Sequence, residues 1–147
     1  MNGGRRVATQ NNFVGRDPNP TYVLMKKTAA LFFLFIVVIV ILADTGNLPH
    51  PVNAIYRIPY GDKFGHFILF GLLNFFVTRA ALSSLSSHRP IRVALSVGLT
   101  LALLIALEEW SQKLFPVRTF ELLDLFASCL GAAVGGVVAW KFAPSSS

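Results

Sequence analysis

Residues 28–43, TAALFFLFIVVIVILA, contain no Asp, Glu, Lys or Arg, and they would be apolar around almost the whole circumference of a helix. Three further runs of 15 or 16 residues also lack these charged residues, namely residues 64–78, 93–107 and 125–140. A helix of this kind lies in lipid or among other helices, because an amphipathic surface helix would have one polar face. The sequence therefore predicts an all-α fold, a bundle of four transmembrane helices.

The composition of the whole chain agrees with a membrane protein. Of its 147 residues, 54% are hydrophobic and 14% are charged, against roughly 25% charged residues in ordinary soluble domains. The mean hydropathy is +0.59. These values exclude a disordered chain and leave too little polar surface to cover a soluble core. The net charge of +6 does not indicate nucleic-acid binding, because no Lys/Arg cluster alternates with aromatic residues.

Each apolar run is shorter than the roughly 20 residues that a helix needs to cross a bilayer. We therefore expect the helices to extend past the runs, over about residues 27–44, 62–82, 91–113 and 122–142. The transmembrane domain then covers residues 27–142, between an unstructured basic tail, residues 1–26, and a short C-terminal tail, residues 143–147. The alternative for the first run is a cleaved signal peptide, which the long preceding tail argues against.

The distribution of Lys and Arg predicts the orientation of the helices. Nine of these residues lie in the two tails, at the start of the first run and in the second connection, and four lie in the first and third connections. Because cytoplasmic segments are enriched in Lys and Arg, both termini are expected to be cytoplasmic. An even number of membrane helices is consistent with this orientation.

The acidic residues gather at the opposite, non-cytoplasmic end. Six of the seven lie in or beside the first and third connections: Asp44, Asp62, Glu108, Glu109, Glu121 and Asp124. Pairs four residues apart share a helix face, such as Asp62 with His66 and Asp124 with Ser128. Two interpretations stay open. Either these groups form an ion-pair network with Lys63 and Arg118 that locks the helix ends together, or they form a functional site within the membrane.

The fourth helix also contains a packing motif. Gly131 and Gly135 form a GxxxG pair, which allows another helix to approach closely. Packing within the chain is the favoured interpretation. A homodimer through the same two glycines is the alternative.

Two short motifs carry a resemblance to a known family. The first, Asp62-Lys63-Phe64-Gly65-His66, has the form D-K-x-x-H. The second begins with Glu109-x-x-Gln112 and continues with Arg118, Asp124 and Gly131. In this order, on successive helices, the two motifs resemble the VanZ-like family over about residues 28–140. That family usually has Asn where this chain has Ser128, and a hydroxyl offers fewer hydrogen bonds than an amide.

The resemblance implies a multi-pass protein of the bacterial inner membrane with a role at the cell envelope. The family's namesake is associated with resistance to the glycopeptide teicoplanin. We hypothesise that the polar cluster binds or modifies an envelope lipid or a lipid-linked precursor. The candidate ligand-binding residues are Lys63, Arg118, Gln112 and Ser128, with the two cations contacting phosphate or carboxylate.

A membrane-embedded hydrolase or transferase and a structural scaffold without chemistry are the alternatives, so enzymatic activity stays undecided. The candidate catalytic residues are His66, Asp62, Glu109 and Asp124, acting as acids and bases. A serine nucleophile has little support in the sequence, because Ser128 is not beside a recognisable base. No paired-His motif is present, so we expect neither a metal ion nor another cofactor. A proton pathway is disfavoured, because the charged groups gather at one end.

Overall fold

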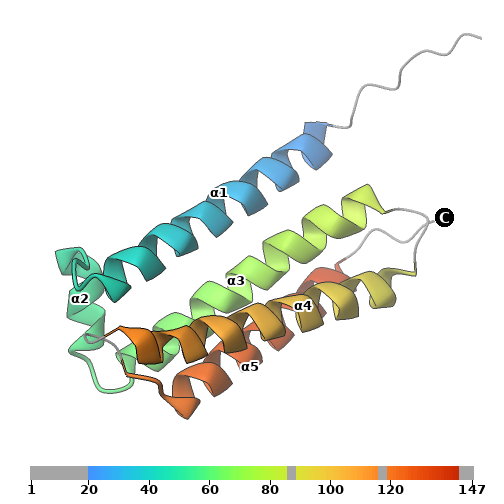
Figure 1. Ribbon diagram of the computed structural model, residues 1–147. Coiled ribbons are helices and arrows are strands. Elements are labelled where there is room, and N and C mark those ends of the chain that lie inside the picture. The colour runs from blue at the N-terminus through green and yellow to red at the C-terminus, as the bar shows by residue number, and fades with distance from the viewer. Residues whose placement is uncertain (1–19, 86–88, 116–118, 143–147) are drawn as a thin grey trace, which may run out of the picture.

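The computed structural model describes residues 20–85, 89–115 and 119–142, and within these ranges the chain is helical and contains no strand. The elements in chain order are α1 (Pro20–Asp44), α2 (His50–Tyr56), α3 (Gly61–Ser84), α4 (Pro90–Ser111), the short 3₁₀ helix η1 (Gln112–Leu114) and α5 (Leu122–Lys141). Figure 1 shows α1, α3, α4 and α5 as the long helices of a bundle. The predicted all-α fold is therefore confirmed.

The described residues include four helices that are long and apolar enough to cross a membrane. These spans are Val23–Asp44, Gly61–Ser84, Pro90–Leu114 and Leu122–Lys141. The shortest has 20 residues, which at 1.5 Å per residue corresponds to about 30 Å, the thickness of a bilayer core. Large apolar side chains lie on the outer surface, such as Leu31 at 67% and Leu99 at 72% exposure. A lipid environment explains this surface, and together with the four apolar helices it indicates a multi-pass membrane protein.

The first helix begins earlier than predicted. We expected residues 1–26 to form an unstructured tail, but α1 starts at Pro20, so residues 20–26 are helical. Proline suits the first position of a helix because its fixed φ is already helical and its missing N–H would have no partner there. The apolar residues 23–25 then lengthen the span. The remainder of the expected tail, residues 1–19, and the C-terminal residues 143–147 lie outside the described residues.

The two short elements, α2 and η1, were not predicted, and both lie at the same end of the bundle. Helix α2 follows Pro49, and a sharp turn then leads into α3 (Figure 1). In that turn Tyr60 has a left-handed backbone with φ of 60°. Next to it, the buried Gly61 lies so close to the backbone of Ile55 that any side chain at this position would overlap the Ile55 carbonyl oxygen. The turn therefore holds α2 against the start of α3.

Helix α3 is the centre of the bundle and packs against α1, α4 and α5. Its closest neighbour is α5, because Gly131 and Gly135 of α5 face the backbone of α3 at Phe67 and Gly71. A side chain at either α5 glycine would overlap a carbonyl oxygen of α3. The predicted packing within the chain is thus confirmed. A homodimer stays a prediction, and with this face occupied by α3 it would have to use another surface.

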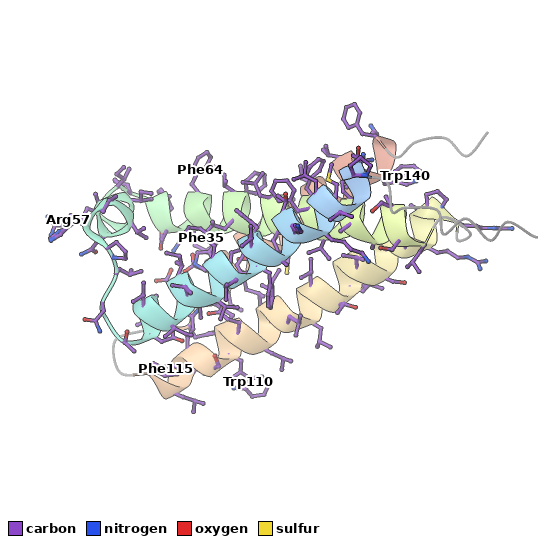
Figure 2. The ribbon with its side chains drawn as sticks, turned by 90° about the horizontal axis from the view of Figure 1, so that it is seen from above. Phe35, Arg57, Phe64, Trp110, Phe115 and Trp140 are labelled. Atoms are coloured by element: carbon purple, nitrogen blue, oxygen red, sulfur yellow. The ribbon has the colours of Figure 1, made fainter. Side chains whose placement is uncertain are left out.

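The arrangement of the helices brings distant connections together. The start of α1, the end of α3, the start of α4 and the end of α5 lie at one end of the bundle, whereas α2, the start of α3, the end of α4 and the start of α5 lie at the other (Figure 1). Trp110 and Trp140 mark these opposite ends (Figure 2). The acidic first and third connections therefore meet at one end, as the sequence predicted.

Candidate functional site

Lys63 is the centre of a charged cluster where α3 meets the start of α5. Its Nζ lies 2.6 Å from Asp62 Oδ2, 2.6 Å from Glu121 Oε2 and 2.9 Å from Asp124 Oδ1. Asp62 and Lys63 are in the first turn of α3, Glu121 directly precedes α5, and Asp124 is in its first turn. The Lys63 side chain is only 16% exposed. One ammonium group thus joins residues that are about 60 positions apart in the sequence.

The same three carboxylates have the spacing of a cation site. Single oxygens of Asp62, Glu121 and Asp124 all lie within 4.8 Å of one another, which is close enough to hold a metal ion. The ammonium of Lys63 lies within hydrogen-bonding distance of all three and therefore supplies the positive charge that this arrangement needs. When all four groups are ionised, the set has a net charge of −2.

A second, buried set of polar groups lies beside the first. Glu109, near the end of α4, is fully buried, and its Oε1 accepts a hydrogen bond from the backbone N–H of Glu121 at 3.0 Å. The side-chain amide of the buried Gln112 donates to Glu109 Oε2 at 3.2 Å and to Glu108 Oε1 at 3.1 Å. Glu121 therefore joins the two sets, with its backbone bonded to Glu109 and its side chain to Lys63.

Glu121 was not among the predicted site residues, although the sequence placed it with the other acids of the connections. Its two contacts depend on how the start of α5 lies against α3 and α4, and residue spacing alone does not reveal this. Glu109 and Asp124, both among the candidate catalytic residues, belong to different sets. Glu109 is bonded to Gln112 and Glu121, whereas Asp124 is paired with Lys63.

His66 pairs with Ser128 across the α3–α5 interface. Its Nδ1 lies 3.0 Å from Ser128 Oγ, within hydrogen-bonding distance, and Ser128 is fully buried. The prediction that Ser128 has no base beside it was therefore wrong. The close approach of α3 and α5 at Gly131 places these two residues opposite each other, because His66 precedes Phe67, the residue on which Gly131 packs. A serine hydroxyl and an imidazole nitrogen at this distance have the spacing of a nucleophile and its general base.

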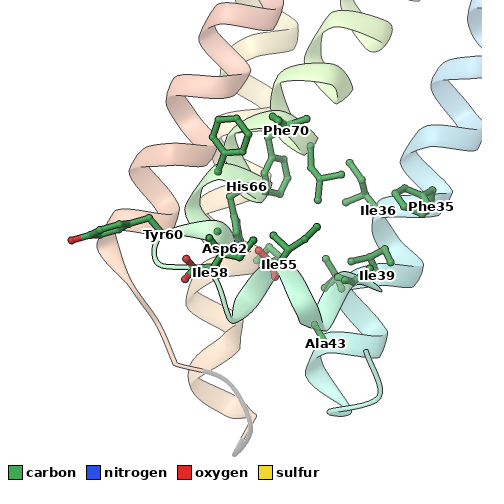
Figure 3. A pocket seen from close by; sticks show the side chains of 18 of the residues that line it. Phe35, Ile36, Ile39, Ala43, Ile55, Ile58, Tyr60, Asp62, His66 and Phe70 are labelled. Atoms are coloured by element: carbon green, nitrogen blue, oxygen red, sulfur yellow. The ribbon is translucent and has the colours of Figure 1, made fainter. Parts of the chain in front are cut away.

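A largely apolar cavity of about 740 Å³ adjoins the polar residues. It lies between α1, α2 and the first half of α3, where Phe35, Ile36 and Ile39 of α1 face His66 and Phe70 of α3 (Figure 3). Its polar lining residues are Asp62, His66 and Glu108, with Tyr60 at the edge and directed away from it (Figure 3). The volume is in the range of about 300–1,000 Å³ that is typical of small-molecule sites.

A further polar contact, which was not predicted, lies deep in the bundle. Asn74 of α3 is buried and donates a hydrogen bond from Nδ2 to the carbonyl oxygen of Ala132 in α5, at 2.6 Å. It also accepts a hydrogen bond from the buried Thr78 hydroxyl at 2.9 Å. Within a membrane this satisfied pair is typical of helix–helix packing. The sequence feature that could have predicted this contact is Asn74 itself, a polar residue within the apolar run 64–78.

The structure thus brings seven of the eight predicted site residues to one end of the bundle. Asp62, Lys63 and Asp124 share the charged cluster, Glu109 and Gln112 share the buried set, and His66 pairs with Ser128. Arg118, the eighth, lies outside the described residues, so its role stays a prediction.

Comparisons with family models, with curated proteins and with solved structures give no match for this chain. The resemblance to the VanZ-like family consequently stays a prediction that rests on the two motifs.

Proposed function

We propose that this protein binds an amphiphilic lipid or a lipid-linked precursor of the cell envelope. The observation that carries the proposal is the apolar cavity beside the polar cluster, with Asp62, His66 and Glu108 in its lining. The lipid chain would occupy the apolar part between α1 and α3, where Ile36, Ile39 and Phe70 lie. The polar end of the lipid would face the carboxylates and the imidazole. A mostly apolar cavity with a few converging polar groups is the usual form of a ligand site.

The proposal includes an orientation in the membrane. The end of the bundle with α1's first turns, the α3–α4 connection and the end of α5 contains Lys26, Lys27, Arg79, Arg92 and Lys141. By the positive-inside rule this end would face the cytoplasm, and the cavity, which is lined by residues at the other end of the bundle, would lie on the side of the outer leaflet. In a bacterial inner membrane, with the VanZ-like resemblance, that position suits a protein acting on envelope lipids. The most specific version of this proposal is that the protein confers resistance to teicoplanin.

Site-specific photo-crosslinking tests lipid binding directly. A photoreactive amino acid is introduced at Ile39, which lines the cavity, and in a matched control at the lipid-exposed Leu99 of α4. After irradiation in cell membranes, the attached lipids are identified by mass spectrometry. We expect Ile39 to capture one lipid class in excess, and Leu99 to capture lipids in proportion to the bulk membrane. Identical lipid profiles at both positions would contradict the proposal.

A second candidate function, a hydrolase or transferase, is favoured by the His66–Ser128 contact. The imidazole could accept the Ser128 proton while the hydroxyl oxygen attacks the acyl carbon of an ester. The acyl–alkoxy bond would then break, and the alcohol would leave with the proton from the imidazole, so that an acyl group stays on Ser128 until water or an acceptor removes it. Ser128 is fully buried, so α5 or a neighbouring helix would have to move before a substrate reached it. A fluorophosphonate probe distinguishes the two functions. Labelling that disappears in Ser128→Ala would support the enzyme, and an unlabelled wild-type protein supports a binding role.

The third candidate, a scaffold without chemistry, is favoured by the contacts of Lys63 with three carboxylates. Single replacements of Asp62, His66 and Glu109 discriminate. Loss of folding in all three variants would favour the scaffold. Folded variants that fail to complement a deletion strain challenged with envelope-targeting antibiotics would favour a site.

A further inference from the structure

Gly65 in α3 is a glycine that contacts within the described residues do not explain. A Cβ added at this position would meet no atom of the described residues within 4 Å. At four other glycines of the helices, an added Cβ would lie within 3.1 Å of a neighbouring backbone: Gly61, Gly71, Gly131 and Gly135. The backbone of Gly65 is helical, so its conformation does not require glycine either. Because glycine is less favourable than alanine inside a helix, the free space beside Gly65 calls for another reason.

Gly65 lies in the middle of the α3 face that lines the cavity. Residues three and four positions away on either side share its helix face, and these are Gly61, Asp62, Ile68 and Leu69. All four line the cavity, as Gly65 itself does. The space that a side chain at residue 65 would occupy therefore belongs to the cavity.

Gly65 also marks the change from polar to apolar lining along α3. Asp62 lies one turn before it, His66 follows it directly, and Leu69 and Phe70 lie about one turn further on. A lipid bound as proposed, with its polar end near the polar residues and its chain among the apolar ones, would have the junction between the two beside Gly65. In a glycerolipid that junction is branched, so it is wider than an unbranched chain.

We infer that Gly65 determines which ligand shape the cavity accepts, because the absent side chain lets the branched junction of an amphiphile lie against the backbone of α3. This inference rests on the proposed function and specifies its ligand as a lipid with a branched junction, such as a glycerolipid. Glycine is the residue that allows a ligand to approach a backbone closely. A side chain at residue 65 would fill the width that the branch needs, whereas an unbranched chain would still fit beside it.

Two photoreactive probes with the same phosphocholine end and the same diazirine-containing chain test the inference. In the branched probe, a glycerol with an acetyl ester on its second carbon joins the chain to the phosphocholine. In the linear probe, the chain is attached to the phosphocholine directly. Each probe is added to the full-length protein in maltoside micelles, and labelling of the α1 segment 35–43, which lines the cavity, is quantified after irradiation. The readout is the ratio of branched-probe to linear-probe labelling, because competition by the detergent affects both probes.

Enlarging residue 65 should lower this ratio. An extra methylene in a binding pocket changes the discrimination between two ligands by roughly 10- to 200-fold. Because a ligand can shift within the cavity, we expect the lower end of this range, a fall of about tenfold in Gly65→Ala, and a larger fall in Gly65→Leu. Gly98→Ala is the matched control, since it adds the same methyl group at a glycine that has room for it but does not line the cavity. It should leave the ratio unchanged.

The outcomes distinguish the inference from the proposed function. An unchanged ratio in both Gly65 variants, or an equal fall in Gly98→Ala, would overturn the inference and leave lipid binding in place. If neither probe labels the segment 35–43 of the wild-type protein more than the exposed surface of α4 around Leu99, the cavity holds no amphiphile and both fail. Gly65→Ala adds one methyl group in free space, so circular dichroism should show an unchanged fold, and this variant decides the test if Gly65→Leu does not fold.

Discussion

Replacing Gly135 by alanine should destabilise the bundle, because it separates α3 from α5. The added Cβ would overlap the Gly71 carbonyl oxygen and lie 2.8 Å from the carbonyl carbon, and both atoms belong to the backbone of a helix. Carbon atoms pack at about 3.5–4.0 Å, so the contact with the carbonyl carbon alone requires the helices to move apart by roughly 0.7–1.2 Å, and the nearer carbonyl oxygen requires more. A gap of that size removes about a quarter to a half of each dispersion contact across the interface.

The expected loss of stability follows from two opposing terms. Overpacking of a well-packed interface costs about 1–3 kcal/mol, and a rigid backbone obstacle on the central interface of the bundle favours the upper half of this range. Alanine recovers up to about 1 kcal/mol through its better helix propensity. We therefore expect a net loss of about 1–2 kcal/mol, measured by SDS-induced unfolding in detergent micelles with circular dichroism as the readout.

Two other glycines provide matched controls. A Cβ at Gly65 would meet no atom within 4 Å, and one at Gly98 would make an ordinary contact of 3.6 Å with the Asn74 amide. Gly65→Ala and Gly98→Ala should therefore be neutral or stabilising by up to about 1 kcal/mol. If Gly135→Ala unfolds at the same SDS fraction as these controls, the close α3–α5 packing described above is wrong.

Three further predictions follow from the contacts. Lys63→Met leaves three carboxylates without their cation and should lower the unfolding free energy by roughly 2–3 kcal/mol. This loss is smaller than the roughly 3–5 kcal/mol for breaking a fully buried pair, because the cluster is partly exposed. Unchanged unfolding in SDS would contradict the ion-pair network. Asn74→Ala leaves a buried carbonyl and a buried hydroxyl without their partner and should lower it by about 1–2 kcal/mol in the same assay. In a background without the native cysteine, cysteines at the exposed Tyr60 and Leu114 should react with an impermeant maleimide added outside cells, and one at Leu85 should not; labelling of Tyr60 and Leu114 from opposite sides would refute the shared polar end.

Hydrophobicity alone predicted the four long helices, since each contains an apolar run that only lipid or other helices can surround. Their bounds agree with the structure to within about two residues, except at the start of α1, where Pro20 begins the helix. Helix α2 escaped prediction because its seven residues, HPVNAIY, are too few to show a helical period. The gathering of six acids at one end also followed from topology, because an up-and-down bundle brings alternate connections together.

The pairing within the site was beyond the sequence because it depends on the register of α3 against α5. Gly131 and Gly135 fix that register through their contacts with Phe67 and Gly71, and only then does His66 lie opposite Ser128. The pairing of Lys63 with Glu121 and Asp124 depends on the same register, because the start of α5 must lie against the first turn of α3. The cavity lies between α1, α2 and α3, and the charged motifs of the sequence do not predict where α1 and α2 lie.

The two roles of Glu121 have a practical consequence for mutagenesis. Its main-chain N–H serves Glu109 and its carboxylate serves Lys63. An alanine scan would remove only the carboxylate and would leave the main-chain donor in place. Such a scan would therefore underestimate how much Glu121 stabilises the contact between α4 and α5. Replacing the backbone amide of Glu121 by an ester would remove the N–H and so measure the contribution of its hydrogen bond to Glu109.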